Sequence, residues 1–241
     1  MKLYIFELGR FIYPGMPQPL PVPGYLIQTD AGQNILVDTG FPEKFIRHPP
    51  APEPAEMAMR PGEYIVDQLA AIGLTPDDID ILVVSHLDID HAGNLLPFSK
   101  ADILLQQQQY AAAKAGHPRF TATQEQWDHP RIRFRLLAGD VKIAEGVELI
   151  ASSGHVPGHQ SVLLHLPHTG PVLLTVDAIL NATMTDAATR MVDVSADNDA
   201  EARDSTRKLM ALAQREEAKL VLFGHDSAQW AGVKKAPDFY S

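Results

Sequence analysis

Four side chains able to bind metal stand within six positions directly after a short apolar run, and this feature limits the possible folds and functions most. Residues 81–84 read Ile-Leu-Val-Val, a β-branched and apolar run typical of a strand buried on both faces. His86, Asp88, Asp90 and His91 follow. On a strand end or tight loop, positions 86, 88 and 90 project to one side, and the next residue can turn inward if a helix begins there. Because nothing structural requires that density of polar groups, the segment predicts a metal site.

The composition limits the classes of binding partner and the types of metal ligand that are possible. The 241 residues include no cysteine, which excludes disulfides, thiolate catalysis and sulfur ligands, so any metal must take nitrogen and oxygen ligands. A formal net charge of −10 without a cluster of Lys and Arg disfavours nucleic-acid binding. We find no apolar stretch long enough for a bilayer and no pattern of a secretory signal. We therefore expect a cytoplasmic protein that acts on a small molecule and binds neither nucleic acid nor membrane.

The order of the expected elements favours an α/β fold, with residues 1–241 forming a single domain. Strands are expected at residues 3–8, 25–29, 34–38, 81–84, 103–105, 141–144, 147–152, 161–166, 172–177 and 220–223. Helices are expected at 63–71, 106–114 and 200–217, with a short helix that begins at Pro76 and leads into the strand at 81–84. Strand clusters that alternate with helices predict two sheets packed between helical layers.

Two proline-rich stretches interrupt this pattern. Residues 13–23 should be irregular or polyproline-like, because proline cannot donate regularly to a sheet. Residues 48–62 are expected to run over the surface. There they form either a pocket wall or subunit contact, or a floppy connector.

The segment after residues 81–84 resembles the His-x-His-x-Asp-His motif of the metallo-β-lactamase superfamily. Further motifs follow in the order and spacing of that superfamily's N-acyl-homoserine lactonase branch, at residues 35–40, 154–161, 175–178 and 223–226. The resemblance covers nearly the entire chain, and ordered motifs at strand ends are more specific than any single one. It implies a four-layer αβ/βα sandwich of two mixed sheets flanked by helices, with metals at one edge of the sheets.

The resemblance also implies a dinuclear cage of seven residues: His86, Asp88 and His155 at one ion, Asp90, His91 and His225 at the other, and Asp177 bridging both. His159 is expected behind the ligands or near the substrate, with a structural hydrogen bond as the alternative. Asp38 is either a partner of a ligand or a turn residue. Asp90 is a candidate proton acceptor as well as a ligand.

Two positions depart from the family pattern. Asp88 stands where the family usually has a second histidine, and its harder, charged carboxylate favours Mn²⁺ or Fe²⁺. The side chain of aspartate is also shorter than that of histidine. Unless the backbone compensates, the site of His86, Asp88 and His155 binds its ion weakly or is empty, and the enzyme is mononuclear. The flavodiiron branch carries a glutamate there and binds iron. Leu180 stands where the lactonase branch has a tyrosine thought to assist at the substrate carbonyl, which makes lactone specificity less secure.

The expected function is metal-dependent hydrolysis of an N-acyl-homoserine lactone-like substrate or a related ester. Two divalent ions, of zinc or, given Asp88, of manganese or iron, can activate a bridging hydroxide while one ion polarises the carbonyl. The resemblance makes a homodimer reasonable. Three alternatives stay open: a thioester or ester hydrolase of the glyoxalase-II type, an iron protein with redox chemistry, and a binding protein with a decayed site.

Overall fold

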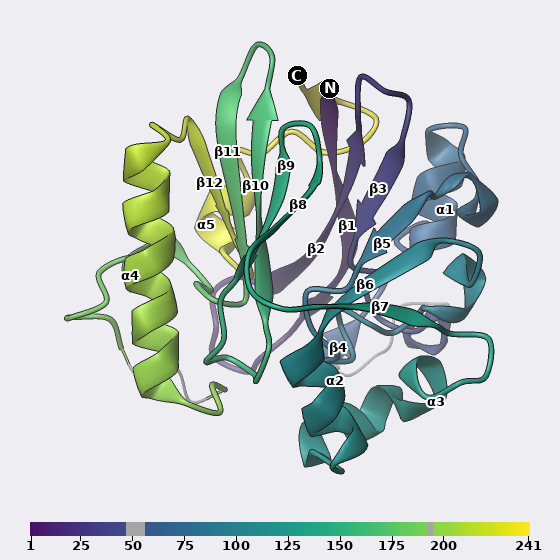
Figure 1. The fold of residues 1–241 in the computed structure, drawn as a ribbon, viewed down its shortest axis with the longest axis horizontal. Helices are drawn as coiled ribbons and strands as arrows, with labels where there is room; N and C mark the ends of the chain where they lie inside the picture. The colour runs from purple at the N-terminus through teal and green to yellow at the C-terminus, as the bar shows by residue number, and fades with distance from the viewer. Residues whose placement is uncertain (47–55, 192–194) are drawn as a thin grey trace.

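A computed structural model describes residues 1–46, 56–191 and 195–241 (Figure 1). The strands are β1 (Lys2–Phe11), β2 (Leu20–Gln28), β3 (Asn34–Val37), β4 (Met57–Ala58), β5 (Ile81–Val83), β6 (Asp102–Gln106), β7 (Phe134–Leu137), β8 (Val141–Ala144), β9 (Val147–Ala151), β10 (Gln160–Leu166), β11 (Gly170–Val176), β12 (Leu220–Phe223) and β13 (Phe239–Tyr240). The helices are α1 (Ile65–Ala71), α2 (Gln107–Lys114), α3 (Gln124–Trp127), α4 (Asp199–Arg215) and α5 (Ser227–Trp230), with short 3₁₀ turns that include η2 (Pro76–Asp78) and η4 (Pro118–Thr123).

The strands form two mixed sheets. The first has the order β13-β1-β2-β3-β5-β6-β7, with β4 paired to β1, and the second has the order β12-β11-β10-β9-β8. Pairing is parallel from β3 through β7 and between β11 and β12, and antiparallel elsewhere. The sheets lie face to face, with α4 against the second and α1 against the first (Figure 1). This arrangement confirms the predicted four-layer sandwich.

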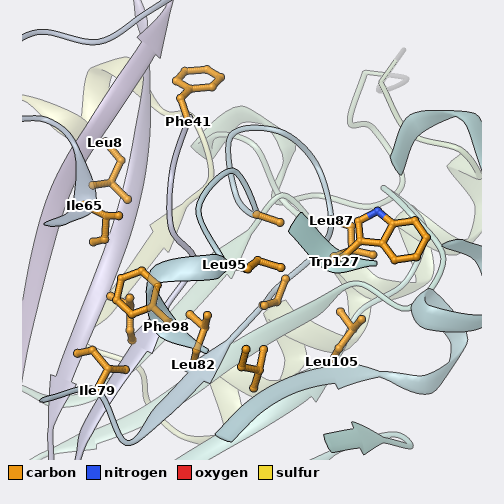
Figure 2. Packing of buried hydrophobic residues seen from close by; sticks show 14 of the residues in the cluster. Leu8, Phe41, Ile65, Ile79, Leu82, Leu87, Leu95, Phe98, Leu105 and Trp127 are labelled. Atoms are coloured by element: carbon orange, nitrogen blue, oxygen red, sulfur yellow. The ribbon is translucent and has the colours of Figure 1, made fainter. Parts of the chain in front are cut away.

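Alternation along the strands sorts the apolar side chains into layers. In β1, Leu3 and Ile5 belong to the cluster between the two sheets, whereas Phe6 belongs to the outer cluster that includes Ile65 and Leu69 of α1. Figure 2 shows part of this outer cluster. A third cluster packs the second sheet against α4. Because full burial of one such side chain contributes about 1.5–3 kcal/mol, these layers dominate the packing energy.

One expectation about the prolines was wrong. Within the stretch 13–23, β2 already begins at Leu20, and it contains Pro21 and Pro23. These prolines lie opposite Arg10 and Glu7 of β1, next to a register shift, and β2 pairs with β3 only further along. The prolines therefore lie beside a bulge, in a part of β2 that pairs with β1 but not with β3. A missing N–H group is tolerated there.

Other differences concern short or distant segments. Residues 48–55 of the second proline-rich stretch lie outside the described residues, so its expected role is not tested there. Its remainder includes β4, which pairs with β1. The strands β7 and β13 were not predicted, because one carries an exposed arginine and the other has two residues. None of the helices that the structure describes is both long enough and apolar enough to cross a membrane.

Candidate metal centre

The segment after β5 folds into a tight turn that points its polar side chains inward. The backbone amides of His91 and Ala92 both donate to the carbonyl of Asp88, at 3.1 and 2.8 Å. The turn docks on the loop after β3, where the Gly93 amide donates to the Gly40 carbonyl at 3.1 Å. A Cβ atom on Gly93 would lie 2.4 Å from that carbonyl oxygen, so the close approach requires glycine. This docking holds the four side chains between residues 86 and 91 in one place.

The second sheet supplies three further side chains at the same edge of the sandwich. His155 lies in the β9–β10 loop, Asp177 follows β11, and His225 follows β12. Val176 has φ = 48°, a costly conformation for a β-branched residue, directly before Asp177. A Cβ atom on Gly224 would lie 2.5 Å from Asp177 Oδ1. Backbone strain and a missing side chain therefore both serve the placement of Asp177.

One cluster of potential ligands consists of Asp90, His91 and His225. Asp90 Oδ2 lies 3.2 Å from His91 Nε2 and 3.5 Å from His225 Nε2. All three residues are buried, and their ligand atoms lie within 4.8 Å of one another. One nitrogen-and-oxygen ligand set of this kind suits a divalent transition metal.

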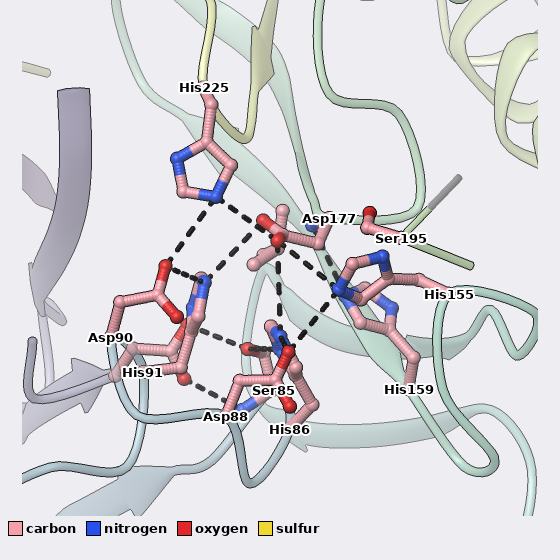
Figure 3. A network of polar contacts seen from close by, with 12 residues as sticks. Ser85, His86, Asp88, Asp90, His91, His155, His159, Asp177, Ser195 and His225 are labelled. Atoms are coloured by element: carbon pink, nitrogen blue, oxygen red, sulfur yellow. Dashed lines mark hydrogen bonds and ion pairs between the residues drawn. The ribbon is translucent and has the colours of Figure 1, made fainter. Parts of the chain in front are cut away.

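A second cluster consists of His86, Asp88 and His155. Asp88 Oδ2 lies 3.3 Å from His86 Nε2 and 3.5 Å from His155 Nε2. Figure 3 shows both clusters with Asp177 between them. The Asp177 carboxylate reaches both, because Oδ2 lies 3.1 Å from His225 Nε2 and 3.4 Å from His155 Nε2. The structure thus brings together all seven residues of the predicted cage; their roles as ligands stay a prediction.

Several ligand atoms fit a cation better than they fit their protein neighbours. His86 Nε2, His91 Nε2 and Asp177 Oδ1 are buried without a hydrogen-bond partner among the residues that the structure describes. A buried polar atom left unpaired costs about 1–3 kcal/mol. A divalent ion at these atoms would remove that cost, so the residues present fit a metal.

A second layer of hydrogen bonds orients the imidazoles. His91 Nδ1 donates to Asp38 Oδ2 at 2.8 Å, and His86 Nδ1 donates to Ser85 Oγ at 3.0 Å, while that hydroxyl donates to the same Asp38 oxygen at 2.6 Å. His225 Nδ1 donates to the Pro21 carbonyl at 2.7 Å. Each bond turns the Nε2 atom of its ring toward the cage, where that nitrogen can bind a metal.

His159 lies behind the cage. Its Nε2 accepts a hydrogen bond from the backbone amide of Asp177 at 3.2 Å, and its Nδ1 donates one to Ser152 Oγ at 2.9 Å. Burial and the neighbouring imidazoles of His86 and His155 hold the pKa of His159 well below its ordinary value. Both ring nitrogens are engaged, so His159 positions Asp177 and has no lone pair left for a metal.

The carboxylates of the cage are held ionised. Burial opposes ionisation of Asp177, but the imidazoles of His225 and His91 keep the pKa of its carboxyl well below its ordinary value. Burial likewise opposes ionisation of Asp88, but His86, His155 and Arg119 keep the pKa of that carboxyl well below its ordinary value. The cage therefore carries negative charge that favours a cation.

Arg119, in η4, is a site residue that sequence reasoning missed. Its Nε donates to both carboxylate oxygens of Asp88, at 2.8 and 2.7 Å, and its Nη2 donates to His155 Nε2 at 2.7 Å. Arg119 lies outside every motif quoted above, and nothing local in Pro-Arg-Phe marks it. Only a search for a positively charged side chain to pair with the unusual Asp88 could have identified Arg119.

The cage forms the floor of a pocket of about 520 Å³. Asp90 and His225 line it from the cage, and Phe11, Leu20 and Leu180 add apolar surface. Its size lies in the range of small-molecule sites, and apolar walls above a few convergent polar groups are typical of them.

Comparison with known proteins decides the family. The family model of the metallo-beta-lactamase superfamily matches residues 17–225. The chain belongs to the metallo-β-lactamase superfamily. Within this superfamily it is 32% identical to an N-acyl homoserine lactonase of Bacillus cereus and 31% identical to one of Bacillus sp., in each case over 99% of this chain and 98% of the relative.

Solved structures agree with the sequence relatives. A structure of the quorum-quenching N-acyl homoserine lactone hydrolase superimposes with a TM-score of 0.87 at 30% identity, and covers 99% of this chain and 98% of that one. A second, of an N-acyl homoserine lactone hydrolase with the product N-hexanoyl-L-homoserine at its catalytic metal center, has a TM-score of 0.86 at 29% identity and the same coverage. The predicted resemblance to this superfamily is confirmed.

Proposed function

We propose that this member of the superfamily is a metal-dependent hydrolase that opens the ring of an N-acyl-homoserine lactone or a closely related lactone. The observation that carries the proposal is the shared carboxylate of Asp177, which lies between two ligand clusters at the floor of an apolar pocket. The full-length similarity to N-acyl homoserine lactonases supports the same substrate class.

The metal is proposed to be zinc, manganese or iron, held first at Asp90, His91 and His225 with Asp177 beside them. The second ion expected from the family resemblance would lie at His86, Asp88 and His155, the cluster that Arg119 also enters. When bound, a divalent ion polarises a carbonyl oxygen and lowers the pKa of water. Nitrogen and carboxylate ligands suit all three metals.

The chain's own residues bind and orient the substrate. Phe11, Leu20 and Leu180 offer apolar surface to an acyl chain, and the pocket floor receives the lactone ring. Asp90 lines the same pocket with an ionised carboxylate, so it can accept a proton as the ring opens. Leu180 has no hydroxyl, so among the described lining residues the hydrogen-bond donors near the carbonyl must come from others, such as Tyr13 or Arg119.

The test is ring opening of N-hexanoyl-L-homoserine lactone, followed by mass spectrometry of the hydroxy-acid product. Protein stripped by a chelator and reloaded with zinc, manganese or iron should recover turnover, and stripped protein should not. His225→Ala should lose at least a hundredfold in rate, because one ligand of the primary cluster is gone. His165→Ala, at a half-exposed histidine paired with Glu216, is the matched control and should keep full activity.

Other outcomes would reject a lactone as the substrate. Reloaded protein that leaves the lactone intact but cleaves a thioester would indicate the glyoxalase-II type of reaction. Protein that retains iron and consumes oxygen without hydrolysis would indicate redox chemistry.

A further inference from the structure

The Arg119 guanidinium lies where the cluster of His86, Asp88 and His155 would hold an ion. Arg119 Nη2 binds two of the three ligand atoms of that cluster, His155 Nε2 at 2.7 Å and Asp88 Oδ2. Its Nε adds bonds to Asp88 Oδ1 at 2.8 Å and Oδ2 at 2.7 Å. The lone pairs that Asp88 and His155 would offer a metal are therefore used by N–H donors, and His86 Nε2 is the ligand atom of this cluster that has no hydrogen-bond partner among the described residues.

A metal and this guanidinium exclude each other at these atoms. A metal would have to approach the nitrogen and the oxygen to about 2.0–2.2 Å, in the position of the guanidinium nitrogen. Arginine cannot lose its proton in a protein, so its positive charge stays and repels a second cation.

Arg119 is also held from behind. Its Nη1 donates to the Ser195 carbonyl and lies 4.0 Å from Asp197 Oδ1, so the guanidinium bridges the cage and the segment before α4. Phe120, the next residue, is fully buried. Swinging the guanidinium away would break bonds to Asp88, His155 and Ser195 together, so the side chain is not a loosely held surface arginine.

We propose that Arg119 replaces one metal ion, so that this chain binds a single divalent ion at Asp90, His91 and His225, with Asp177. The inference rests on the proposed metal dependence. It explains why position 88 holds a carboxylate, since a carboxylate accepts two N–H bonds from arginine and a neutral imidazole cannot. Asp88 and Arg119 thus form an ion pair that holds His155 in place without an ion.

The experiment measures metal per chain. Wild-type protein, expressed in medium supplemented with zinc or with manganese and freed of loose metal, is analysed by elemental mass spectrometry. We expect one ion per chain in the wild type and two in Arg119→Ala, because Asp88 and His155 regain their free lone pairs. Arg203→Ala is the matched control, since that arginine is equally buried and also pairs through Nε with an aspartate, Asp199, at 2.7 Å. It should keep one ion.

Two further variants locate the ion in wild-type protein. His155→Ala should keep one ion and His225→Ala should lose it, because His155 belongs only to the cluster that Arg119 enters and His225 only to the cluster of Asp90 and His91. Arg119→Lys keeps a positive charge and should stay at one ion, which covers the case in which Arg119→Ala does not fold.

Several results would overturn the inference. Two ions per chain in the wild type, or one ion in a folded Arg119→Ala protein, would show that Arg119 does not exclude a metal. Loss of metal in His155→Ala with retention in His225→Ala would place the ion in the cluster of His86, Asp88 and His155. Absence of metal from every variant would reject metal dependence and this inference with it. One ion in the wild type and two in Arg119→Ala would support the inference even if no lactone is opened.

Discussion

At the scale of single residues, the centre depends on which nitrogen of each imidazole faces the cage. Asp38 decides this for His91, because its Oδ2 binds Nδ1 at 2.8 Å and so turns Nε2 toward the cage. Asp38 is itself fully buried and held in a left-handed conformation at φ = 63°. Asp38 therefore controls the orientation of a proposed ligand of the cluster of Asp90, His91 and His225.

Asp38→Asn should weaken metal binding by about tenfold to a hundredfold, because the amide has one acceptor oxygen for the donors Ser85 N, Ser85 Oγ and His91 Nδ1, which two carboxylate oxygens now serve. Competition with a coloured chelator measures the dissociation constant. Asp140→Asn, at an exposed aspartate that accepts the Ala151 amide at 2.8 Å, is the control. Equal affinities in the two variants would contradict a role of Asp38 in orienting His91.

Tyr25 gives a second residue-scale prediction, on alkaline stability. Burial and the nearby Asp38 carboxylate raise the pKa of its phenol well above the ordinary value. Above about pH 10 the unfolded chain loses this proton and the folded chain keeps it, so the free energy of unfolding falls as pH rises further. Urea denaturation at pH 8 and pH 11 should show a smaller fall for Tyr25→Phe. An equally steep fall in both proteins would remove Tyr25 as its source.

At the scale of elements, the site depends on loops that bind tightly to their neighbours. The β9–β10 loop carries His155 and is tied to the segment before α4, because the amides of Asp197 and Asn198 donate to the carbonyls of His155 and Gly154, both at 3.0 Å. Gly154 has φ = 129°, and a Cβ atom there would lie 2.1 Å from the Ala202 amide nitrogen in α4. The start of α4 thus fixes the position of one cage residue.

Gly154→Ala should lower the free energy of unfolding by about 1–2 kcal/mol through its backbone conformation and by roughly 1–3 kcal/mol more through overpacking against α4. Gly139→Ala is the control, since its φ is also positive, at 76°, but a Cβ atom there meets open space. Urea denaturation compares the two. A cost no larger for Gly154→Ala than for Gly139→Ala would show that the loop yields without strain.

At the scale of the whole molecule, the cage connects the two sheets. The segment after β5 belongs to the first sheet, whereas Asp177 and His225 follow strands of the second (Figure 3). A bound ion would therefore link the two halves of the sandwich. Without one, buried carboxylates face each other around a common space.

Removal of metal should destabilise the whole fold. At a free-metal concentration a hundredfold above the dissociation constant, binding contributes about 2.7 kcal/mol, which corresponds to a Tm difference on the order of 5–10 °C for a chain of this size. Differential scanning calorimetry of loaded and chelator-treated protein measures it, with His225→Ala as a variant that should show no difference. An unchanged wild-type Tm would show that metal does not bind the folded chain in preference to the unfolded one.

Much of the fold and the composition of the cage could be predicted from the sequence, because both follow from short-range patterns. Apolar runs mark strands buried on both faces, and polar residues directly after residues 81–84, 172–176 and 220–223 meet where those strands end at one edge. The ordered motifs indicated the family because each of them is also a short-range pattern.

Tertiary structure alone decided where distant groups meet. Arg119 reaches Asp88 from 31 residues away because the η4 turn packs beside the cage, and no periodicity or motif records that contact. The prolines of β2 join the sheet because a bulge in β1 and the absence of β3 beside them remove the need for their N–H groups. The local sequence determines which polar side chains a segment carries. Which charged partner each of those side chains contacts depends on the packing of the entire chain.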